Sequence, residues 1–307
     1  MGGMFGTVLS NMVSLVLLMA VGFICRQLRI LNDEVVAGLS QLLMKVTLPA
    51  TIVMSMQKDF STSLLEESLL TLAISAAVYF AGTLIATLLA RLLRPGKSAT
   101  PVWQFALTFP NVGYMGFPVT NAIFGDSCLM YTSMANVSFN VMAFTFGIGL
   151  VSKDGRQKGG WRKILINPAI ISAVLGFALF LFSFRLPAPL AEGAQMTANM
   201  TTPLSMLVVG ALLAKYDLKT VFKGWKMYPL IAVRLLVLPL LIVWPLHHFI
   251  MNPVMRGVLI ILPAMPAAAL TAIFAEAFGG DSQLASRLVF VSTIASVLTI
   301  PLVSLLM

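Results

Sequence analysis

Long apolar runs alternate with short polar stretches along the whole chain. An α-helix rises about 1.5 Å per residue, so an apolar run of about 20 residues crosses a hydrocarbon core of about 30 Å. The pattern predicts an all-α polytopic membrane protein with ten transmembrane helices. They are expected near residues 5–25, 35–57, 66–90, 101–126, 127–151, 166–184, 194–214, 228–250, 254–278 and 283–306.

The fourth run, at 101–126, is not compatible with one regular helix. It contains Pro110 and Pro118, and an asparagine and two glycines lie between them. Proline removes a backbone donor, and its ring crowds the preceding turn. In lipid, an interrupted helix is tolerated only where protein or water satisfies the freed polar groups. We therefore expect two half-helices that meet at the bilayer midplane, as at the substrate sites of many secondary transporters.

Other runs also contain prolines. The ninth run, at 254–278, contains Pro263 and Pro266, and the second run contains Pro49. The fourth and ninth runs occupy the same place in two successive sets of five. Interrupted helices at matching places in two halves are typical of transporters built from repeats.

Two halves of five spans are necessarily inverted relative to one another, because five is an odd number. The expected organisation is a five-helix repeat at 1–151, a basic cytoplasmic loop at 152–165 and an inverted five-helix repeat at 166–307.

Composition and charge agree with a membrane protein. Of the 307 residues, 59% are hydrophobic and 10% are charged, whereas soluble domains contain about 25% charged residues. Fifteen of the twenty Lys and Arg residues lie in connections after odd-numbered spans or in the adjoining span ends, and three lie in the other connections or their adjoining span ends. The positive-inside rule then places both termini outside a cell's inner membrane. The net charge of +9 thus indicates orientation in the bilayer, and no nucleic-acid partner is expected.

The interrupted runs carry motifs that resemble a known family. Residues 111–118 read Asn-Val-Gly-Tyr-Met-Gly-Phe-Pro, similar to the Asn-x-Gly-x-x-Gly-x-Pro signature of the auxin efflux carrier family. Residues 265–268 (Met-Pro-Ala-Ala), 278–281 (Phe-Gly-Gly-Asp) and 299–301 (Thr-Ile-Pro) resemble that family's last two spans.

The resemblance implies a ten-span fold in which the fourth and ninth helices cross at their interruptions, and a homodimer. Family members include plant auxin exporters and bacterial permeases for malonate and malate, and the distant bile-acid/sodium symporters share the architecture. The short loop at 152–165 favours the bacterial organic-acid branch.

The expected binding residues of the fourth run suit a carboxylate. Half-helix N-termini offer free amides and partial positive charge, and Asn111 is predicted to bind the substrate directly. Gly113 and Gly116 allow close approach of backbone and substrate. Tyr114 either lines the site or packs within the protein.

Other candidate binding residues lie in the ninth, fifth and second runs. Ala267 and Ala268 are expected to contribute backbone groups. Asn136 and Asn140 share one helical face, where they either bind substrate or join helices by hydrogen bonds. Lys45 could pair with a substrate's negative charge or titrate, since charges inside a membrane are costly and usually functional.

Arg234 is the second basic residue that lies away from the ends of a span. It lies close to the predicted cytoplasmic end, so its side chain either extends to the surface or has a function. Acidic residues fall only near the ends of the spans, so proton or sodium coupling stays open. No cofactor, metal cluster or catalytic constellation is expected, which argues against an intramembrane enzyme.

The sequence therefore predicts a secondary active transporter of a small organic anion, such as a mono- or dicarboxylate or an auxin-like acid. The expected mechanism is alternating access, with an elevator-type movement of a core that contains both interrupted helices. The alternatives are an organic-anion channel on the same fold and a sodium-coupled, bile-acid-like symporter.

Overall fold

The computed structural model describes residues 2–151, 164–215, 221–222, 224, 227–278 and 280–305. The described ranges are helical and contain no β-strand, which confirms the all-α prediction. The chain divides into two compact units, and each is described by itself. Unit 1 comprises residues 1–72, 113–137 and 165–215, and unit 2 comprises residues 73–112, 138–164 and 216–307.

Seven helical runs in the described ranges are long and apolar enough to cross a membrane. They are Leu9–Gln27, Asp33–Ser55, Thr62–Leu93, Val112–Leu150, Ala188–Leu213, Met227–Phe249 and Ser282–Ser304, and Pro168–Leu181 is a shorter apolar helix. A multi-pass membrane protein is therefore supported. The ten-span inverted repeat stays a prediction, partly because the expected ninth span consists of two short helices.

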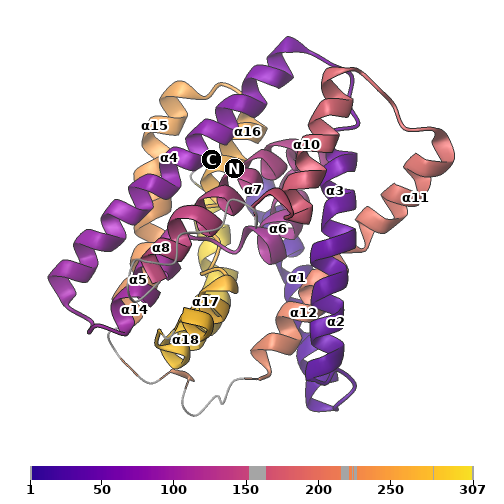
Figure 1. The fold of residues 1–307 in the computed structure, drawn as a ribbon. Helices are drawn as coiled ribbons and strands as arrows, with labels where there is room; N and C mark the ends of the chain where they lie inside the picture. The colour runs from indigo at the N-terminus through magenta and orange to yellow at the C-terminus, as the bar shows by residue number, and fades with distance from the viewer. Residues whose placement is uncertain are drawn as a thin grey trace. The chain divides into compact units, whose positions relative to one another are not determined.

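Unit 1 contains most of the N-terminal helices. Its elements are α1 (Gly2–Gln27), α2 (Asp33–Leu42), η1 (Leu43–Thr47), α3 (Leu48–Ser55), the start of α4 (Thr62–Leu93), η2 (Val112–Gly116), α6 (Phe117–Phe124), η3 (Gly125–Cys128), the start of α7 (Leu129–Met142), α10 (Pro168–Leu181), α11 (Ala188–Asn199) and α12 (Thr201–Leu213). Figure 1 shows α10 alongside α3.

Two glycines allow α1 and α12 to pack with their backbones in contact. A Cβ atom added to Gly22 would overlap the carbonyl oxygen of Leu207. A Cβ atom added to Gly210 would overlap the carbonyl oxygen of Met19. Small residues at such interfaces are the usual means by which helices approach closely in membranes.

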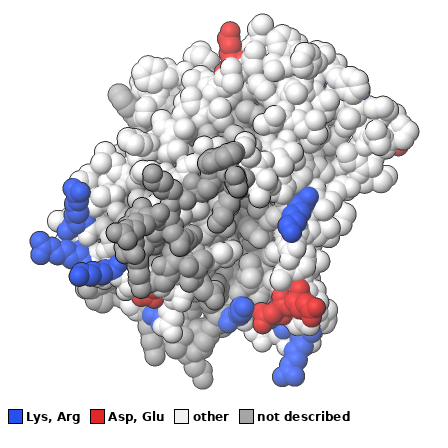
Figure 2. Space-filling model, viewed as in Figure 1, with Lys and Arg blue, Asp and Glu red and all other residues white. Residues whose placement is uncertain are grey.

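Ion pairs in unit 1 connect the ends of three helices. Asp33, at the start of α2, pairs with Arg26 of α1 at 2.8 Å and with Lys215, just after α12, at 3.1 Å. Asn32 caps α2, since its side-chain oxygen accepts a hydrogen bond from the amide of Val35. On the face seen in Figure 2, most of the described surface belongs to uncharged residues, and the charged side chains form a few small groups.

Unit 2 contains most of the C-terminal helices. Its elements are the rest of α4 and α7, α5 (Ala99–Thr108), η4 (Ala143–Gly147), α8 (Ile148–Val151), α14 (Met227–Ala232), η5 (Val233–Val237), α15 (Leu238–Phe249), α16 (Pro253–Ile261), α17 (Leu270–Phe278) and α18 (Ser282–Ser304).

An aromatic cluster lies inside unit 2. The ring centroid of Phe105 is 4.6 Å from that of Phe109 and 5.2 Å from that of Phe274. Phe109 also contacts Phe139, with centroids 6.0 Å apart. The cluster packs directly beside the end of α5, and it therefore helps to fix the position of the interruption that follows.

Three prolines follow π-helical segments. Pro49, Pro118 and Pro239 are each the second residue of an α-helix that continues from η1, η2 and η5, respectively. The wider π turn relieves the clash between a proline ring and the carbonyl of the preceding turn. Pro49 and Pro118, expected to break their helices, therefore lie in helical runs that continue through them.

Candidate functional site

The two interrupted stretches of unit 2 pair with each other. Helix α5 ends at Thr108 and helical structure resumes at Val112, while α16 ends at Ile261 and α17 begins at Leu270. Pro110 and Ala267 lie opposite each other in an isolated antiparallel bridge.

Two backbone hydrogen bonds flank this bridge. The amide of Asn111 donates to the carbonyl oxygen of Pro266 at 2.8 Å, and the amide of Ala268 donates to that of Phe109 at 3.0 Å. Each interruption thus satisfies polar groups of the other, as a broken helix in lipid requires. The interruptions expected at Pro110 and Pro266 are present, and Pro263 lies in the turn between α16 and that pairing.

Arg234 binds the carbonyl groups beside these interruptions. It lies on η5 and is only 3% exposed. Its Nη1 donates to the carbonyl oxygen of Leu107 at 2.7 Å and of Thr108 at 3.5 Å, and its Nε donates to that of Met265 at 3.2 Å. The first two carbonyls form the last turn of α5, where the helix dipole is negative. The guanidinium therefore stabilises the end of a half-helix, and its side chain is buried rather than extended to the surface.

One donor of Arg234 is left over. Within the described residues, Nη2 has no hydrogen-bond partner and the guanidinium has no ion pair with an acid. A guanidinium stays protonated in proteins, and a buried charge is costly unless it is paired. Among the described residues, the site therefore holds a buried positive charge without an acidic partner and one buried donor without an acceptor.

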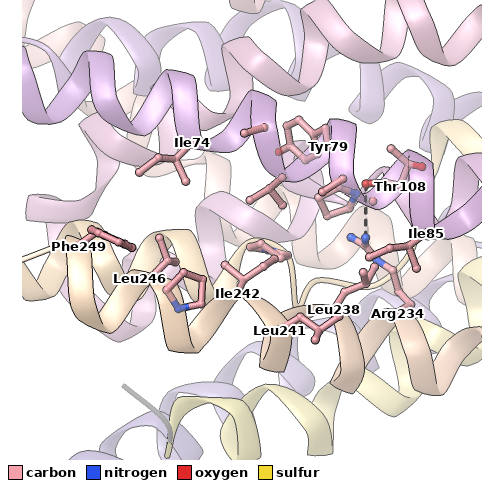
Figure 3. Close-up of a pocket in the computed structure, with 17 residues that line it drawn as sticks. Ile74, Tyr79, Ile85, Thr108, Arg234, Leu238, Leu241, Ile242, Leu246 and Phe249 are labelled. Carbon is pink, nitrogen blue, oxygen red and sulfur yellow. Dashed lines mark hydrogen bonds between the residues drawn. The ribbon is translucent and has the colours of Figure 1, made fainter.

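Arg234 lines a half-open cavity of about 500 Å³ in unit 2, and the lining residues Leu241 and Phe249 are exposed. The cavity lies between α4 and α15, with Ile74 and Phe249 toward one end and Arg234, Thr108 and Ile85 toward the other (Figure 3). Among the described residues that line it, polar side chains come only from Tyr79, Thr108 and Arg234. A cavity of this size, with apolar walls and few polar groups, is typical of a small-molecule site.

A second cavity, of about 300 Å³, lies in unit 1. Its polar lining residues are Thr51, Asn121, Asp126, Gln195, Asn199, Thr201 and Thr202. Several of them bond to one another, since Thr51 and Thr201 share a hydroxyl contact of 2.8 Å and Gln195 donates to Asn199 at 2.8 Å. Among the described residues that line this cavity, no buried side-chain atom is left without a hydrogen-bond partner.

The expected binding residues of unit 2 lie close to the paired interruptions. Asn111 is 5% exposed, and its backbone takes part in the pairing. The amide of Ala267 donates to Oγ of Ser292 at 3.1 Å, and that of Ala268 is engaged with Phe109. Backbone amides that we expected to face a substrate are therefore bonded to the protein in this conformation.

The two asparagines of α7 are both buried. Asn140, in unit 2, is 4% exposed, and Asn136, in unit 1, is 2% exposed. Their burial agrees with inward-facing amides on one helix. Their binding role stays a prediction.

The remaining candidates belong to unit 1. Tyr114 packs against the apolar cluster of Val36, Val208 and Ala211. The carbonyl of Gly116 accepts a hydrogen bond from Thr120 at 2.7 Å. A Cβ atom on Gly113 would meet the side chains of Met44 and Leu48 at ordinary contact distances. These residues are tightly packed in helical structure, and their binding role also stays a prediction.

Lys45 differs from Arg234 in its surroundings. It lies on η1 and is exposed, and its Nζ donates to Oε1 of Gln41 at 3.2 Å. Among the described Lys and Arg residues, Arg234 is the buried one, so the interpretation in which its side chain extends to the surface is wrong. The sequence feature that indicates a functional role for Arg234 is its position within a span that contains no acidic residue to pair with it.

Comparison with known proteins points to transport. A family model described as membrane transport protein matches residues 7–304. An uncharacterized transporter of Methanocaldococcus jannaschii is 25% identical over 296 residues, which cover 93% of this chain and 94% of the relative. One from Methanothermobacter thermautotrophicus is 25% identical over 97% of both chains. The uncharacterized transporter YfdV of Escherichia coli K12 is 21% identical over 96% of both.

Proposed function

The chain belongs to the membrane transport protein family, and from this premise we propose that it is a secondary transporter of a small organic anion. Family membership confirms the resemblance to the auxin efflux carriers. The observation that carries the choice of an anion is Arg234, a buried cation beside the paired interruptions, with an unused donor and a cavity next to it.

A carboxylate suits this site for two physical reasons. It would neutralise the uncompensated guanidinium, and charge-assisted hydrogen bonds are about twice as strong as neutral ones. It would also satisfy Nη2, which otherwise remains buried without a partner. A cationic substrate would meet the same charge repulsively, and a neutral one would leave it uncompensated.

The proposed cycle is alternating access, in which the bound anion faces each side of the membrane in turn. The polar groups released by the two interrupted helices are satisfied by the protein, as is usual where irregular backbone lines a transporter site. Both termini outside the cell membrane, a homodimer, and proton or sodium coupling belong to this proposal and require separate tests.

Uptake into proteoliposomes tests the proposed function. The purified protein would be reconstituted and supplied with labelled malonate, malate and octanoate in parallel, with and without sodium and a pH gradient. We expect saturable uptake of at least one of these anions, and counterflow when unlabelled anion is preloaded. Flux that rises linearly with concentration and lacks counterflow would instead indicate a channel.

Two variants connect the flux to the site. Arg234→Gln should reduce uptake at least tenfold, because it removes the buried charge. Arg91→Gln makes the same chemical change at an exposed arginine of unit 2 and should leave uptake unchanged. Asn111→Ala examines the predicted direct ligand, and full transport by this variant would remove Asn111 from the site.

A further inference from the structure

The cavity beside Arg234 is elongated and has its charge toward one end. Its α4 wall extends from Ile74 to Ile85, and its α15 wall from Leu238 to Phe249. Either stretch corresponds to about 16 Å along a helix axis. Figure 3 shows Arg234 and Phe249 far apart along this cavity.

The walls away from the charge are aliphatic. They include Ala77, Val78, Leu241, Ile242 and Leu246. A compact dicarboxylate such as malonate would place one carboxylate on Arg234 and the second against apolar walls. Burial of an ion without a partner is far more costly than any gain from the small apolar part of such a ligand.

The guanidinium is enclosed. Arg234 is 3% exposed, and Thr108, Pro110 and Pro263 line the cavity with it. Nη2 itself is almost inaccessible to solvent, so only a compact group such as a carboxylate would approach it, and only after a small shift of the neighbouring side chains. A phospholipid would have to fit a phosphate, a glycerol and a second acyl chain at the same buried position, which disfavours a membrane lipid as the occupant.

We propose that the cavity binds a linear aliphatic monocarboxylate, with the carboxylate on Nη2 of Arg234 and the hydrocarbon chain between α4 and α15. This rests on the proposed function and specifies its substrate class. Since each buried methylene contributes about 0.8 kcal/mol, affinity should rise roughly fourfold per methylene until the chain fills the cavity.

Equilibrium binding tests the chain-length relation. The full-length protein in phosphatidylcholine nanodiscs would be titrated with labelled hexanoate, octanoate, decanoate and malonate, and empty nanodiscs would correct for partition into lipid. We expect decanoate to bind most tightly of the four and malonate most weakly. Equal affinities for the three monocarboxylates, or tighter binding of malonate, would overturn the proposal.

A pair of variants on α15 locates the hydrocarbon chain. Ile242→Trp fills the apolar part of the cavity and should weaken decanoate binding at least tenfold. Leu240→Trp makes a change of similar size at an exposed residue of the same helix that is absent from the cavity lining, and should leave binding unchanged. Equal affinities of the two variants for decanoate would contradict this placement of the hydrocarbon chain. Thermal unfolding would establish that both variants are folded.

The experiments distinguish a failure of this inference from a failure of the proposed function. Saturable, Arg234-dependent uptake of malonate without any effect of chain length or of Ile242→Trp would refute the inference and leave the transporter intact. Chain-length-dependent binding without saturable flux of any anion would support the inference and refute the transporter. Release of a co-purified phospholipid by Ile242→Trp, without monocarboxylate binding to wild type, would assign the cavity to lipid and overturn the inference.

Discussion

The Nη1 atom of Arg234 donates a hydrogen bond of 2.7 Å to the carbonyl oxygen of Leu107, 127 positions away in the chain. This contact joins η5 to the last turn of α5, beside the interruption at Pro110. The charge at the candidate site and the end of the half-helix thus hold each other in place. Substitutions at either should affect both stability and transport.

Replacement of Arg234 by leucine should be destabilising. The carbonyls of Leu107 and Met265 would lose their charged donor, and a buried acceptor left without a partner costs about 1–3 kcal/mol. We expect a lower unfolding temperature in addition to lost uptake. Arg234→Lys keeps the charge but lacks the planar fork of donors, and should be intermediate in stability. An unfolding temperature of Arg234→Leu equal to that of wild type would contradict the assigned contacts.

Ser292 supports the paired interruptions, because its Oγ accepts the amide of Ala267. Ser292→Ala would leave this buried amide without its acceptor and should lower the free energy of unfolding by about 1–3 kcal/mol. Ser296→Ala is the matched control, since the hydroxyl of Ser296 donates to Thr293 within the same helix. Chemical unfolding in detergent measures the free energy of unfolding of both variants. A larger loss of stability in Ser296→Ala than in Ser292→Ala would argue against a supporting role for Ser292.

Gly147 is expected to be sensitive because aromatic rings lie directly above it. A Cβ atom there would be 2.8 Å from the ring of Phe105 and 3.0 Å from that of Phe109. Gly147→Ala should displace Phe109, whose carbonyl bonds to Ala268, and should therefore reduce uptake. Gly149→Ala, two residues on, meets nothing within 4 Å and should transport normally. Proteoliposome uptake compares the two, and equal rates would show that the rings adjust freely.

Gly22 and Gly210 should tolerate no side chain. A Cβ atom at either position would overlap a backbone carbonyl of the facing helix, so α1 and α12 would have to separate. Gly22→Ala is expected to cost about 1–3 kcal/mol, as overpacking commonly does. Gly6→Ala lies on the same helix with nothing within 4 Å of its Cβ and serves as the control. Comparable unfolding temperatures for both variants would mean that this interface is loose.

Local chemistry explains what could be anticipated from the sequence. Hydropathy and proline positions predict an all-helical membrane protein with interruptions at Pro110 and Pro266, because both depend only on residues within one turn or one span. The same argument predicts breaks at Pro118 and Pro49, where the helical structure continues. A π turn before each proline absorbs the steric conflict, and nothing in the residue pattern distinguishes this outcome from a break.

The site was less accessible to such reasoning because it depends on long-range contacts. Its polarity makes Asn111 a candidate ligand, and its backbone does lie at the interruptions. Its charge makes Lys45 a candidate as well, yet Lys45 is exposed, whereas Arg234 is buried against the carbonyls of Leu107 and Thr108, more than one hundred positions away. The sequence contains both cations but does not reveal which of them packs beside the broken helices.

The permanent charge of Arg234 has a consequence for energetics in a polarised membrane. The empty site carries one positive charge, and a site occupied by a monocarboxylate is electrically neutral. Movement of one elementary charge through a potential of 100 mV involves about 2.3 kcal/mol. In an alternating-access cycle that carries this site through the field, the voltage therefore acts on the return of the empty transporter and leaves the loaded step almost unaffected.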